Sequence, residues 1–321
     1  MKENNIYVES EFAPLRRVVL TQSQFAFPKN MKDSNFLLEE YLIDIIENEG
    51  KDFADAFPKE QLKWEEEREN LKKVLEKYNV EICRPRLLTD YEKEVGGDDG
   101  YSNFFSRDPF FTIGNIIIEG SLRFPHRRNE ILPIRDILVN ESNKNNCFYL
   151  SIPSVDFSKG IDSEVGPFLE GGDILVLGKT IFVGNSGLAS NKNGINWLRN
   201  LLSNFDYTLI EVPLANDVLH LDCALSIVRE DLIIVCEEAL LNGIPKELEN
   251  FDKIRVSKED VSRLAVNGLQ IDRNTYITDP EFEFIGKQLE QRGITVEYID
   301  FKISRSFGGS FRCSTQPLLR K

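Results

Sequence analysis

Short apolar runs recur along the chain in a repeated pattern. In four segments, two such runs are joined by a short turn, with the turn sequences Gly-Asn, Gly-Lys, Arg-Glu-Asp and Asp-Arg-Asn. The four segments are residues 110–120, 174–184, 224–235 and 264–278. Because these turn residues suit the backbone conformations of tight hairpins, the pattern predicts four β-hairpins.

A helical segment and another strand follow three of the hairpins. Residues 194–205, 237–250 and 280–292 have apolar positions at helical spacing, and each segment precedes a further apolar run. The repeated unit is therefore strand, strand, helix, strand. A fifth unit can be assembled from residues 16–20 as a strand, with Tyr149 or the C-terminal tail contributing its partners.

One long charged segment interrupts this repetition. Residues at about 34–78 are predicted to form a mostly helical insertion, and residues 39–78 contain thirteen acidic and seven basic side chains. We interpret this charge as a solvated helix face. Since no Pro-, Gly- or Ser-rich linker divides the sequence, we expect a single domain over residues 1–321 that includes the insertion.

Composition and charge exclude several classes of function. The 321 residues carry a formal net charge of −14, which repels nucleic acid and anionic membranes and attracts cationic ligands. The apolar runs are much shorter than the ~20 residues of a membrane span, and the N-terminus lacks the apolar stretch of a signal peptide. Five cysteines without a C-x-x-C pair argue against disulfides and a thiolate zinc site. We expect a cytoplasmic protein.

Polar residues that turn chemistry does not explain precede several strands. Asp108 stands before the first hairpin, Glu170 begins an acidic Gly-Gly turn before the second, and His220 and Asp222 lead into the third. The i, i+2 spacing of His220 and Asp222 on an extended strand would put both side chains on one face. Cys313 follows a Gly-rich approach near the C-terminus. A thiol, a base and several carboxylates at equivalent positions of a repeat indicate cysteine-based covalent catalysis.

Other candidates have ordinary structural interpretations. The remaining cysteines lie in apolar strand-like runs, so we expect them to be packing residues. His220 and Cys223 have His-x-x-Cys spacing, but the sequence adds no further ligands for zinc, and we expect neither a metal nor a cofactor. His126 lies in the one compact basic cluster, Phe124-Pro125-His126-Arg127-Arg128, and is predicted to be a surface residue.

The motifs together resemble a known superfamily. The sequences RDPFFTIGNIIIEG, LEGGD, HLD and SFGGSFRCST look like those of the guanidino-group-modifying enzymes, which include amidinotransferases, arginine deiminases and dimethylarginine hydrolases. The resemblance runs from about residue 15 to residue 320, outside the acidic insertion. It implies a pentein α/β-propeller, in which five ββαβ units surround a central active-site cavity.

The resemblance also implies a mechanism. Cys313 would attack the central carbon of the guanidinium, and His220 would protonate the leaving amine and later activate the second nucleophile. Glu170 would hold His220, while Asp108 and Asp222 would bind the guanidinium nitrogens. Two carboxylates suit a planar cation with several N–H donors. A bound cation would also lower the pKa of the thiol.

Two features of the chemistry stay open at this stage. The covalent intermediate can pass to an amine or to water, and the resemblance favours the amidinotransferase branch, with deiminase-type hydrolysis as the alternative. A non-catalytic pentein-fold binding protein and a degenerate enzyme are the minor alternatives. The oligomeric state is open as well, and a homo-oligomer fits the sequence.

The way in which a donor's carboxylate is held forms the second open feature. Many relatives that bind an amino acid carry an arginine where this chain has Ala189. Half of the usual clamp for an α-carboxylate is then missing, and Arg127 or Arg128 could supply the other half, since relatives place a basic residue after the first hairpin. The donor is therefore arginine-like with its carboxylate held unusually, or it lacks a carboxylate.

Overall fold

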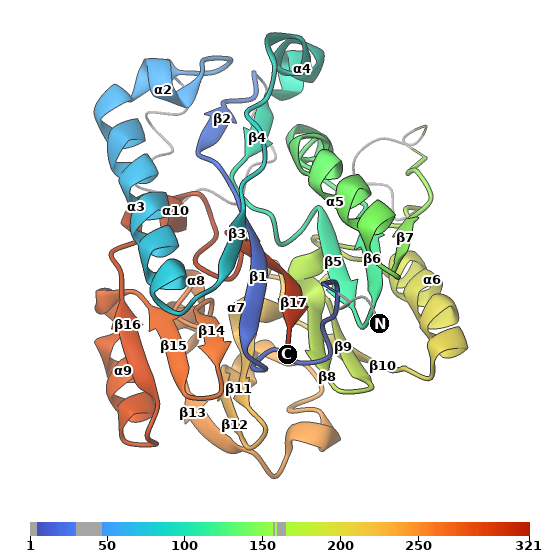
Figure 1. The fold of residues 1–321 in the computed structure, drawn as a ribbon, viewed down its shortest axis with the longest axis vertical. Coiled ribbons are helices and arrows are strands. Elements are labelled where there is room, and N and C mark those ends of the chain that lie inside the picture. The colour runs from blue at the N-terminus through green and yellow to red at the C-terminus, as the bar shows by residue number, and fades with distance from the viewer. Residues whose placement is uncertain (1–4, 30–46, 157, 159–164) are drawn as a thin grey trace.

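The computed structural model describes residues 5–29, 47–156, 158 and 165–321. Within these ranges the chain forms five three-stranded sheets and one two-stranded sheet. Each three-stranded sheet, or blade, contains an antiparallel hairpin and a third strand that runs parallel to one of its neighbours. A parallel third strand requires a crossover connection. The predicted pentein α/β-propeller of five units is thus confirmed (Figure 1).

The four predicted hairpins form the first two strands of four blades. The blade after the first hairpin comprises β5 (Phe110–Ile113), β6 (Ile116–Glu119), α5 (Leu132–Lys144) and β7 (Phe148–Ser151). The next comprises β8 (Ile174–Leu177), β9 (Thr180–Asn185), α6 (Lys192–Leu202) and β10 (Thr208–Pro213). The third comprises β11 (Leu225–Arg229), β12 (Leu232–Val235) and β13 (Asp252–Arg255). The fourth comprises β14 (Leu269–Asp272), β15 (Thr275–Thr278), α9 (Glu283–Glu290) and β16 (Thr295–Tyr298).

The remaining blade joins distant parts of the sequence. It comprises β17 (Thr315–Arg320), β1 (Leu15–Leu20), α3 (Pro58–Lys77) and β3 (Glu81–Cys83). The C-terminal tail therefore supplies the partner of β1, as one version of the prediction had it. Tyr149 does not, because it lies in β7 and pairs with Ile117 of β6.

The predicted acidic insertion is in part a blade helix. Helix α3 connects the parallel strands β1 and β3, and it buries Trp64, Leu71 and Leu75 at helical spacing among its charged residues. The charged residues of α3 form the predicted solvated face, whereas the assignment of the whole segment to an insertion was wrong for this part. The high charge of the segment hid its apolar stripe. Residues 30–46 of the predicted insertion lie outside the described residues, and the short helix α2 (Phe53–Ala56) precedes α3.

Two further predictions of local structure were wrong. Residues 237–250 form only the 3-10 turns Glu237–Ala239 and Lys246–Leu248, because Gly243 has a φ of 72° and Pro245 lacks a backbone N–H. The fourth hairpin begins at Leu269 rather than near residue 264, where Leu264 has a φ of 68°. A backbone at positive φ cannot continue a strand.

Short elements fill the space between the blades. They are β2 (Gln24–Ala26), which pairs with β4 (Tyr101–Asn103), and the helices α4 (Asp90–Gly96), α7 (Leu221–Ala224), α8 (Lys258–Ser262) and α10 (Lys302–Ser306). None of the described helices has the length and apolar character that crossing a lipid bilayer requires.

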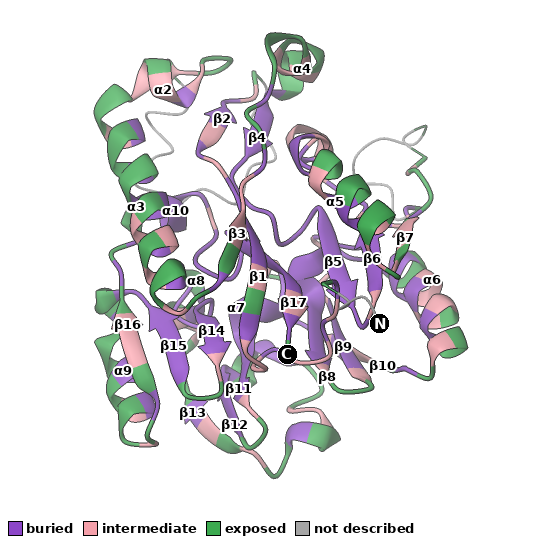
Figure 2. Ribbon diagram, viewed as in Figure 1, coloured by how far each residue is buried: buried purple, intermediate pink, exposed green. Residues whose placement is uncertain are grey.

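Burial follows the blade arrangement. The hairpin strands are largely buried, whereas the parallel third strands β3, β7, β10, β13 and β16 and the outward faces of α3, α5, α6 and α9 are partly exposed (Figure 2). The largest apolar cluster lies between the blades of β8–β10, β11–β13 and β14–β16. The strands of these three blades are therefore held by a packed apolar core.

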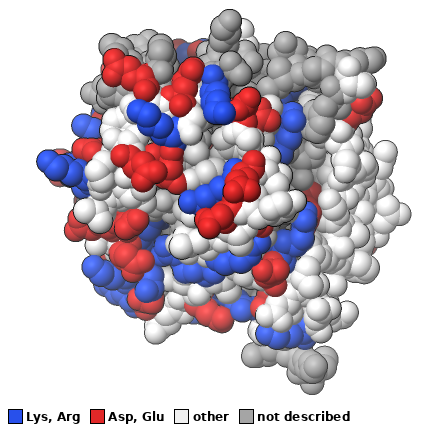
Figure 3. All heavy atoms as spheres, turned by 90° about the horizontal axis from the view of Figure 1, so that it is seen from above, with Lys and Arg blue, Asp and Glu red and all other residues white. Residues whose placement is uncertain are grey.

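On the face of the molecule seen from above, acidic and basic side chains are interspersed rather than gathered by sign (Figure 3).

Candidate active site

A cavity opens where the entries to several blades meet. It has an empty volume of about 650 Å³ and contains Asp108, His220 and Cys313 in its lining. Asp108 precedes β5, His220 precedes α7, and Cys313 precedes β17, so each side chain comes from a different blade. The other lining residues are Phe25, Pro28, Phe104, Phe105, Phe124, His126, Arg127, Leu219, Phe307 and Gly308.

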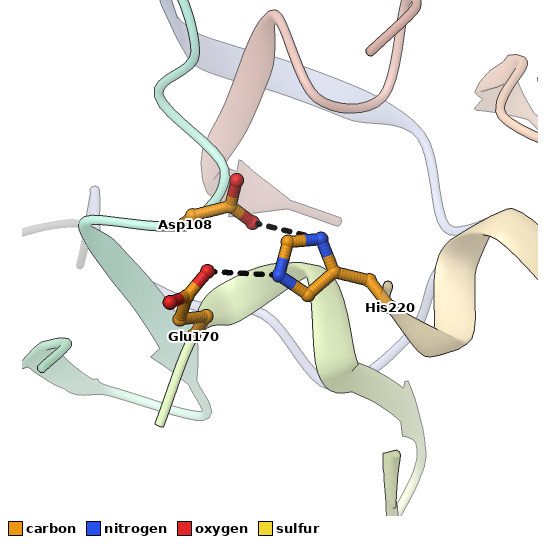
Figure 4. A group of neighbouring side chains, drawn as sticks. All are labelled: Asp108, Glu170 and His220. Atoms are coloured by element: carbon orange, nitrogen blue, oxygen red, sulfur yellow. Dashed lines mark hydrogen bonds and ion pairs between the residues drawn. The ribbon is translucent and has the colours of Figure 1, made fainter. Parts of the chain in front are cut away.

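His220 lies between two carboxylates (Figure 4). Its Nε2 lies 2.9 Å from Oε2 of Glu170, and its Nδ1 lies 3.9 Å from Oδ1 of Asp108. His220 and Asp222 do not share an extended strand as predicted, because the backbone turns into α7 directly after His220. Asp173 of the acidic turn accepts a hydrogen bond from the backbone N–H of Leu221, which fixes this turn beside His220.

The carboxylate of Asp222 approaches the candidate nucleophile. Its Oδ2 lies 3.9 Å from Sγ of Cys313 and 2.9 Å from Nη1 of Arg312. Arg312 also pairs with the buried Glu11, so Asp222 is held in position by an ion pair that reaches the N-terminal segment. Asp222 therefore faces the thiol that the sequence identified, with its position fixed from behind.

The loop before Cys313 is held by one side chain and by close packing. Oδ1 of Asn267 accepts hydrogen bonds from the backbone N–H groups of Ser310 and Cys313. A Cβ atom at Gly309 would lie 2.3 Å from the ring of Phe105 and 2.8 Å from Cβ of Cys313. Only glycine fits there without displacing the thiol.

Buried charges set opposite protonation states for His220 and Cys313. Burial acts to lower the pKa of His220, but Asp108, Glu170 and Asp173 outweigh it and raise that pKa to about 10. Burial, Asp222 and Asp108 raise the pKa of the Cys313 thiol well above its ordinary value. Near neutral pH the free site thus holds an imidazolium and a neutral thiol, and a cationic ligand between the carboxylates would favour the thiolate.

Arg127, one of the two arginines considered for a substrate carboxylate, lines the cavity. Its Nη2 lies 2.7 Å from Asp108, its Nε lies 2.9 Å from Glu130, and its Nη1 lies 3.5 Å from Glu170. With three protein carboxylates around it, the guanidinium balances their charge instead. Glu130, which follows from no sequence motif, is buried, and burial raises its pKa to about 7 despite Arg127.

The other residues considered for a substrate carboxylate lie outside the cavity lining. Arg128 is half-buried, and its Nη2 donates to the carbonyl oxygen of Arg123. Ala189 is fully buried, and its carbonyl oxygen accepts a hydrogen bond from Nε of Arg123 at 3.5 Å. The guanidinium of Arg123 packs over the ring of Phe168 with its Cζ 4.5 Å from the ring centroid. The space beside Ala189 is therefore filled by an arginine from another blade.

His126 is half-buried and lines the cavity, so it is less exposed than the predicted surface position implies. Burial and the neighbouring Arg127 and Arg128 lower its pKa to about 3, which leaves the imidazole neutral. The sequence suggested a surface residue because two arginines follow His126, yet Arg127 turns inward to the carboxylates. No local pattern could have shown this, since the partners Asp108 and Glu170 are distant in the sequence.

One described group of side chains could in principle hold a metal ion. Ligand atoms of Asp108, Glu170 and His220 lie within 4.8 Å of one another. The Arg127 guanidinium already contacts both carboxylates, and Nε2 of His220 is bonded directly to Glu170. A divalent cation would have to displace these bonds and lie beside a fixed positive charge. The geometry is that of a buried cluster of hydrogen bonds and ion pairs.

Comparisons with known proteins agree with this architecture. A family model described as N,N dimethylarginine dimethylhydrolase, eukaryotic, matches residues 58–320. The chain belongs to this family. The dimethylarginine dimethylhydrolase family match spans all five blades apart from β1, and it contains each candidate site residue.

The known proteins that are similar to this chain include amidinotransferases. An uncharacterized protein of Bacillus subtilis is 27% identical over 78% of this chain and 78% of its own length. The L-arginine:L-lysine amidinotransferase of Pseudomonas savastanoi pv. phaseolicola is 24% identical over 86% of this chain and 83% of its own. A solved structure of SxtG, an amidinotransferase from Microseira wollei in a saxitoxin pathway, shares the fold with a TM-score of 0.80 at 20% identity, covering 99% and 98% of the two chains.

These findings give the general class of the protein. It is a pentein-fold enzyme of the guanidino-modifying superfamily. The two branches among the matches, hydrolase and amidinotransferase, differ in the reaction that follows the attack on the guanidino carbon.

Proposed function

We propose that the protein transfers an amidino group from a guanidino donor to an amine, with Cys313 as the nucleophile. The observation that carries the proposal is that Asp108, His220 and Cys313 line one cavity. Directly behind this lining, Asp222 lies 3.9 Å from Sγ of Cys313, and Glu170 lies 2.9 Å from Nε2 of His220. A thiol, a protonated base and two guanidinium-binding carboxylates are the groups that this chemistry needs. The whole chain acts in this proposal as a single catalytic domain.

The first half-reaction begins when the guanidinium enters between Asp108 and Asp222. Its charge compensates the two carboxylates that keep the Cys313 thiol protonated, so the thiolate becomes accessible. Sγ bonds to the guanidino carbon, and the imidazolium of His220 protonates the departing amine as the C–N bond breaks. Glu170 keeps His220 oriented and charged for this step. An S-amidino-cysteine remains.

The second half-reaction reverses the roles of these groups. The amine product leaves, an acceptor amine takes its place, and the now neutral His220 removes a proton from the acceptor. The acceptor nitrogen bonds to the amidino carbon and the C–S bond breaks, which regenerates the Cys313 thiolate. The rings of Phe105 and Phe307 beside Cys313 support transfer over hydrolysis, because they reduce the access of water to the intermediate.

Hydrolysis is the second candidate, and the family model that matches the chain favours it. In that reaction the unsubstituted or methylated nitrogen leaves first, the donor's carbon chain stays on Cys313, and water releases a ureido product. The two reactions therefore break different C–N bonds and leave different groups on the same sulfur.

The mass of the covalent adduct separates the two reactions. The enzyme is mixed with arginine, quenched in acid within one turnover, and the peptide that contains Cys313 is measured by mass spectrometry. Transfer predicts an amidino adduct without the donor chain, ornithine as the first product, and turnover that requires an added amine such as glycine or lysine. An adduct that retains the donor chain, with citrulline formed without added amine, would refute the transfer reaction. If neither arginine nor other guanidino compounds form any adduct, the enzymatic proposal itself fails.

A further inference from the structure

The walls of the cavity are unusually rich in phenyl rings. Five phenylalanines contribute to the lining: Phe25, Phe104, Phe105, Phe124 and Phe307. Four of them contact one another edge to face, with ring centroids of Phe25 and Phe307 5.3 Å apart and those of Phe104 and Phe105 4.5 Å apart. They belong to an aromatic cluster that extends to the buried Trp64 of α3. A wall of packed rings is rigid and offers a ligand apolar surface.

The described lining also contains five side chains with polar or ionisable groups. They are Asp108, His126, Arg127, His220 and Cys313. Of these, Asp108, His220 and Cys313 already have roles at the guanidinium in the proposed reaction. The remaining two, His126 and Arg127, are the ones that could bind another polar group of the donor.

Neither of these two residues offers a positive charge to a carboxylate. The Arg127 guanidinium is surrounded by Asp108, Glu130 and Glu170, so a further anion there would be repelled. His126 is neutral, because burial and the two arginines beside it hold its pKa far below 7. Among the described residues, the lining thus contains no side chain that would pair with the α-carboxylate of an amino acid. A carboxylate left without a partner in an apolar cavity is strongly disfavoured.

We propose that the preferred donor is a guanidine with an apolar alkyl or aryl substituent and no carboxylate, and that Phe124 is a specificity residue for that substituent. This inference rests on the proposed function and narrows its donor. The guanidinium lies between Asp108 and Asp222, and the substituent extends along the phenyl rings. Transfer then breaks the bond between the guanidino carbon and the nitrogen that carries the substituent. His220 gives its proton to that nitrogen, and an apolar amine leaves while the amidino group stays on Cys313.

A series of four donors tests this inference directly. Butylguanidine has the carbon chain of arginine without its α-amino and α-carboxylate groups, agmatine carries the chain with a terminal amine, and phenethylguanidine carries an aromatic ring. Release of butylamine, putrescine, phenethylamine or ornithine is followed by mass spectrometry with the same amine acceptor. We expect kcat/KM for butylguanidine and phenethylguanidine to exceed that for arginine by about 10²-fold, the scale of discrimination that an unpaired buried charge produces.

The outcomes distinguish this inference from the function on which it rests. If arginine is the better donor by kcat/KM, the inference is overturned while the proposed function stands. If none of the four donors is consumed and no adduct forms on Cys313, the proposed function has failed. If kcat/KM for agmatine equals that for butylguanidine, the result would support a preferred donor without a carboxylate but would overturn the preference for an apolar terminus.

Variants of Phe124 test its role apart from folding. Phe124 is only half-buried, so its replacement should leave the fold intact. Phe124→Ala is expected to raise KM for phenethylguanidine about tenfold through lost apolar contact, with little change for unsubstituted guanidine. Phe124→Leu should restore most of the affinity. The matched control is Phe284→Ala on the outer helix α9, where the side chain is exposed. Equal effects on both donors would overturn the role of Phe124 in specificity.

Discussion

The pair formed by His220 and Glu170 makes a quantitative prediction about protonation. Replacing Glu170 with glutamine removes a buried charge 2.9 Å from Nε2 of His220 and keeps an oxygen that can accept a hydrogen bond. A hydrogen bond to a charged group contributes about 1.5–3 kcal/mol, and each 1.36 kcal/mol corresponds to one pKa unit. Glu170→Gln should therefore lower the pKa of His220 from about 10 to roughly 8–9.

The chain is well suited to measuring this change, because it contains only two histidines. His126, with a pKa of about 3, should not titrate between pH 5 and pH 11, so a single imidazole resonance should move in that range. Isotope-labelled histidine and NMR give the pKa of His220 in both forms. The basic limb of the kcat profile should shift in the same direction, since the reaction uses the protonated imidazole as an acid.

The stability of the fold should depend on pH with the matching sign. The pKa of His220 is raised above its unfolded value of 6.5, so its stabilisation is complete below about pH 6.5 and is lost as the pH rises through about 10. Glu170→Gln should weaken this dependence. The matched control is Glu119→Gln. Glu119 is a buried carboxylate that accepts hydrogen bonds from Arg135 away from the cavity, so its replacement should leave the titration of His220 unchanged.

Either of two observations would refute this explanation of the pKa of His220. If His220 titrates near 6.5 in the unaltered protein, or if Glu170→Gln leaves its pKa near 10, the carboxylates do not set its charge. The pKa of a histidine at such a distance from two buried carboxylates cannot be insensitive to both if the described geometry holds.

Three other substitutions test the proposed roles in assays of guanidino consumption. Cys313→Ser should lower kcat at least about 10³-fold, whereas Cys147→Ser, at a half-buried cysteine far from the cavity, should leave it unchanged. Asp222→Asn should lower kcat/KM about 10²-fold while making the Cys313 thiol react faster with iodoacetamide, because Asp222 raises the pKa of that thiol; slower alkylation would contradict this cause. Gly309→Ala should reduce kcat by about tenfold or more by displacing the nucleophile, while Gly96→Ala, where the nearest atom would be 3.7 Å from the new Cβ, should be silent in the same assay.

The sequence predicted the hairpins and their strand-end residues because both depend on local pattern. Apolar runs separated by turn residues determine β5–β6, β8–β9 and β11–β12, and the residues before each hairpin come with them. The helix predicted after β12, over residues 237–250, does not form. Pro245 lacks a backbone N–H for helical hydrogen bonding, and this outweighed the helical spacing of the apolar residues around it. The assignment of α3 to an insertion was wrong for a similar reason. The high charge of this blade helix concealed the apolar stripe that contains Trp64.

The supporting charges of the site could not be predicted in the same way. Glu11 and Arg312 pair across almost the whole chain, and Arg127 reaches Glu170 from another blade. Such pairs depend on which side chains the closed ring brings together, and no spacing along the sequence encodes them. The sequence therefore identified the residues that face the cavity better than the residues that hold them.

The pairing of β1 with β17 has a consequence for how this enzyme matures. Leu15 pairs with Arg320, so this blade forms only after residue 320 has been synthesised. Contacts between such distant residues form slowly during folding. The entry to β17 also carries Cys313, and Arg312 beside it needs Glu11 as a partner. We therefore expect ribosome-bound and truncated chains to be inert toward guanidines, so that catalytic competence appears together with the final docking step.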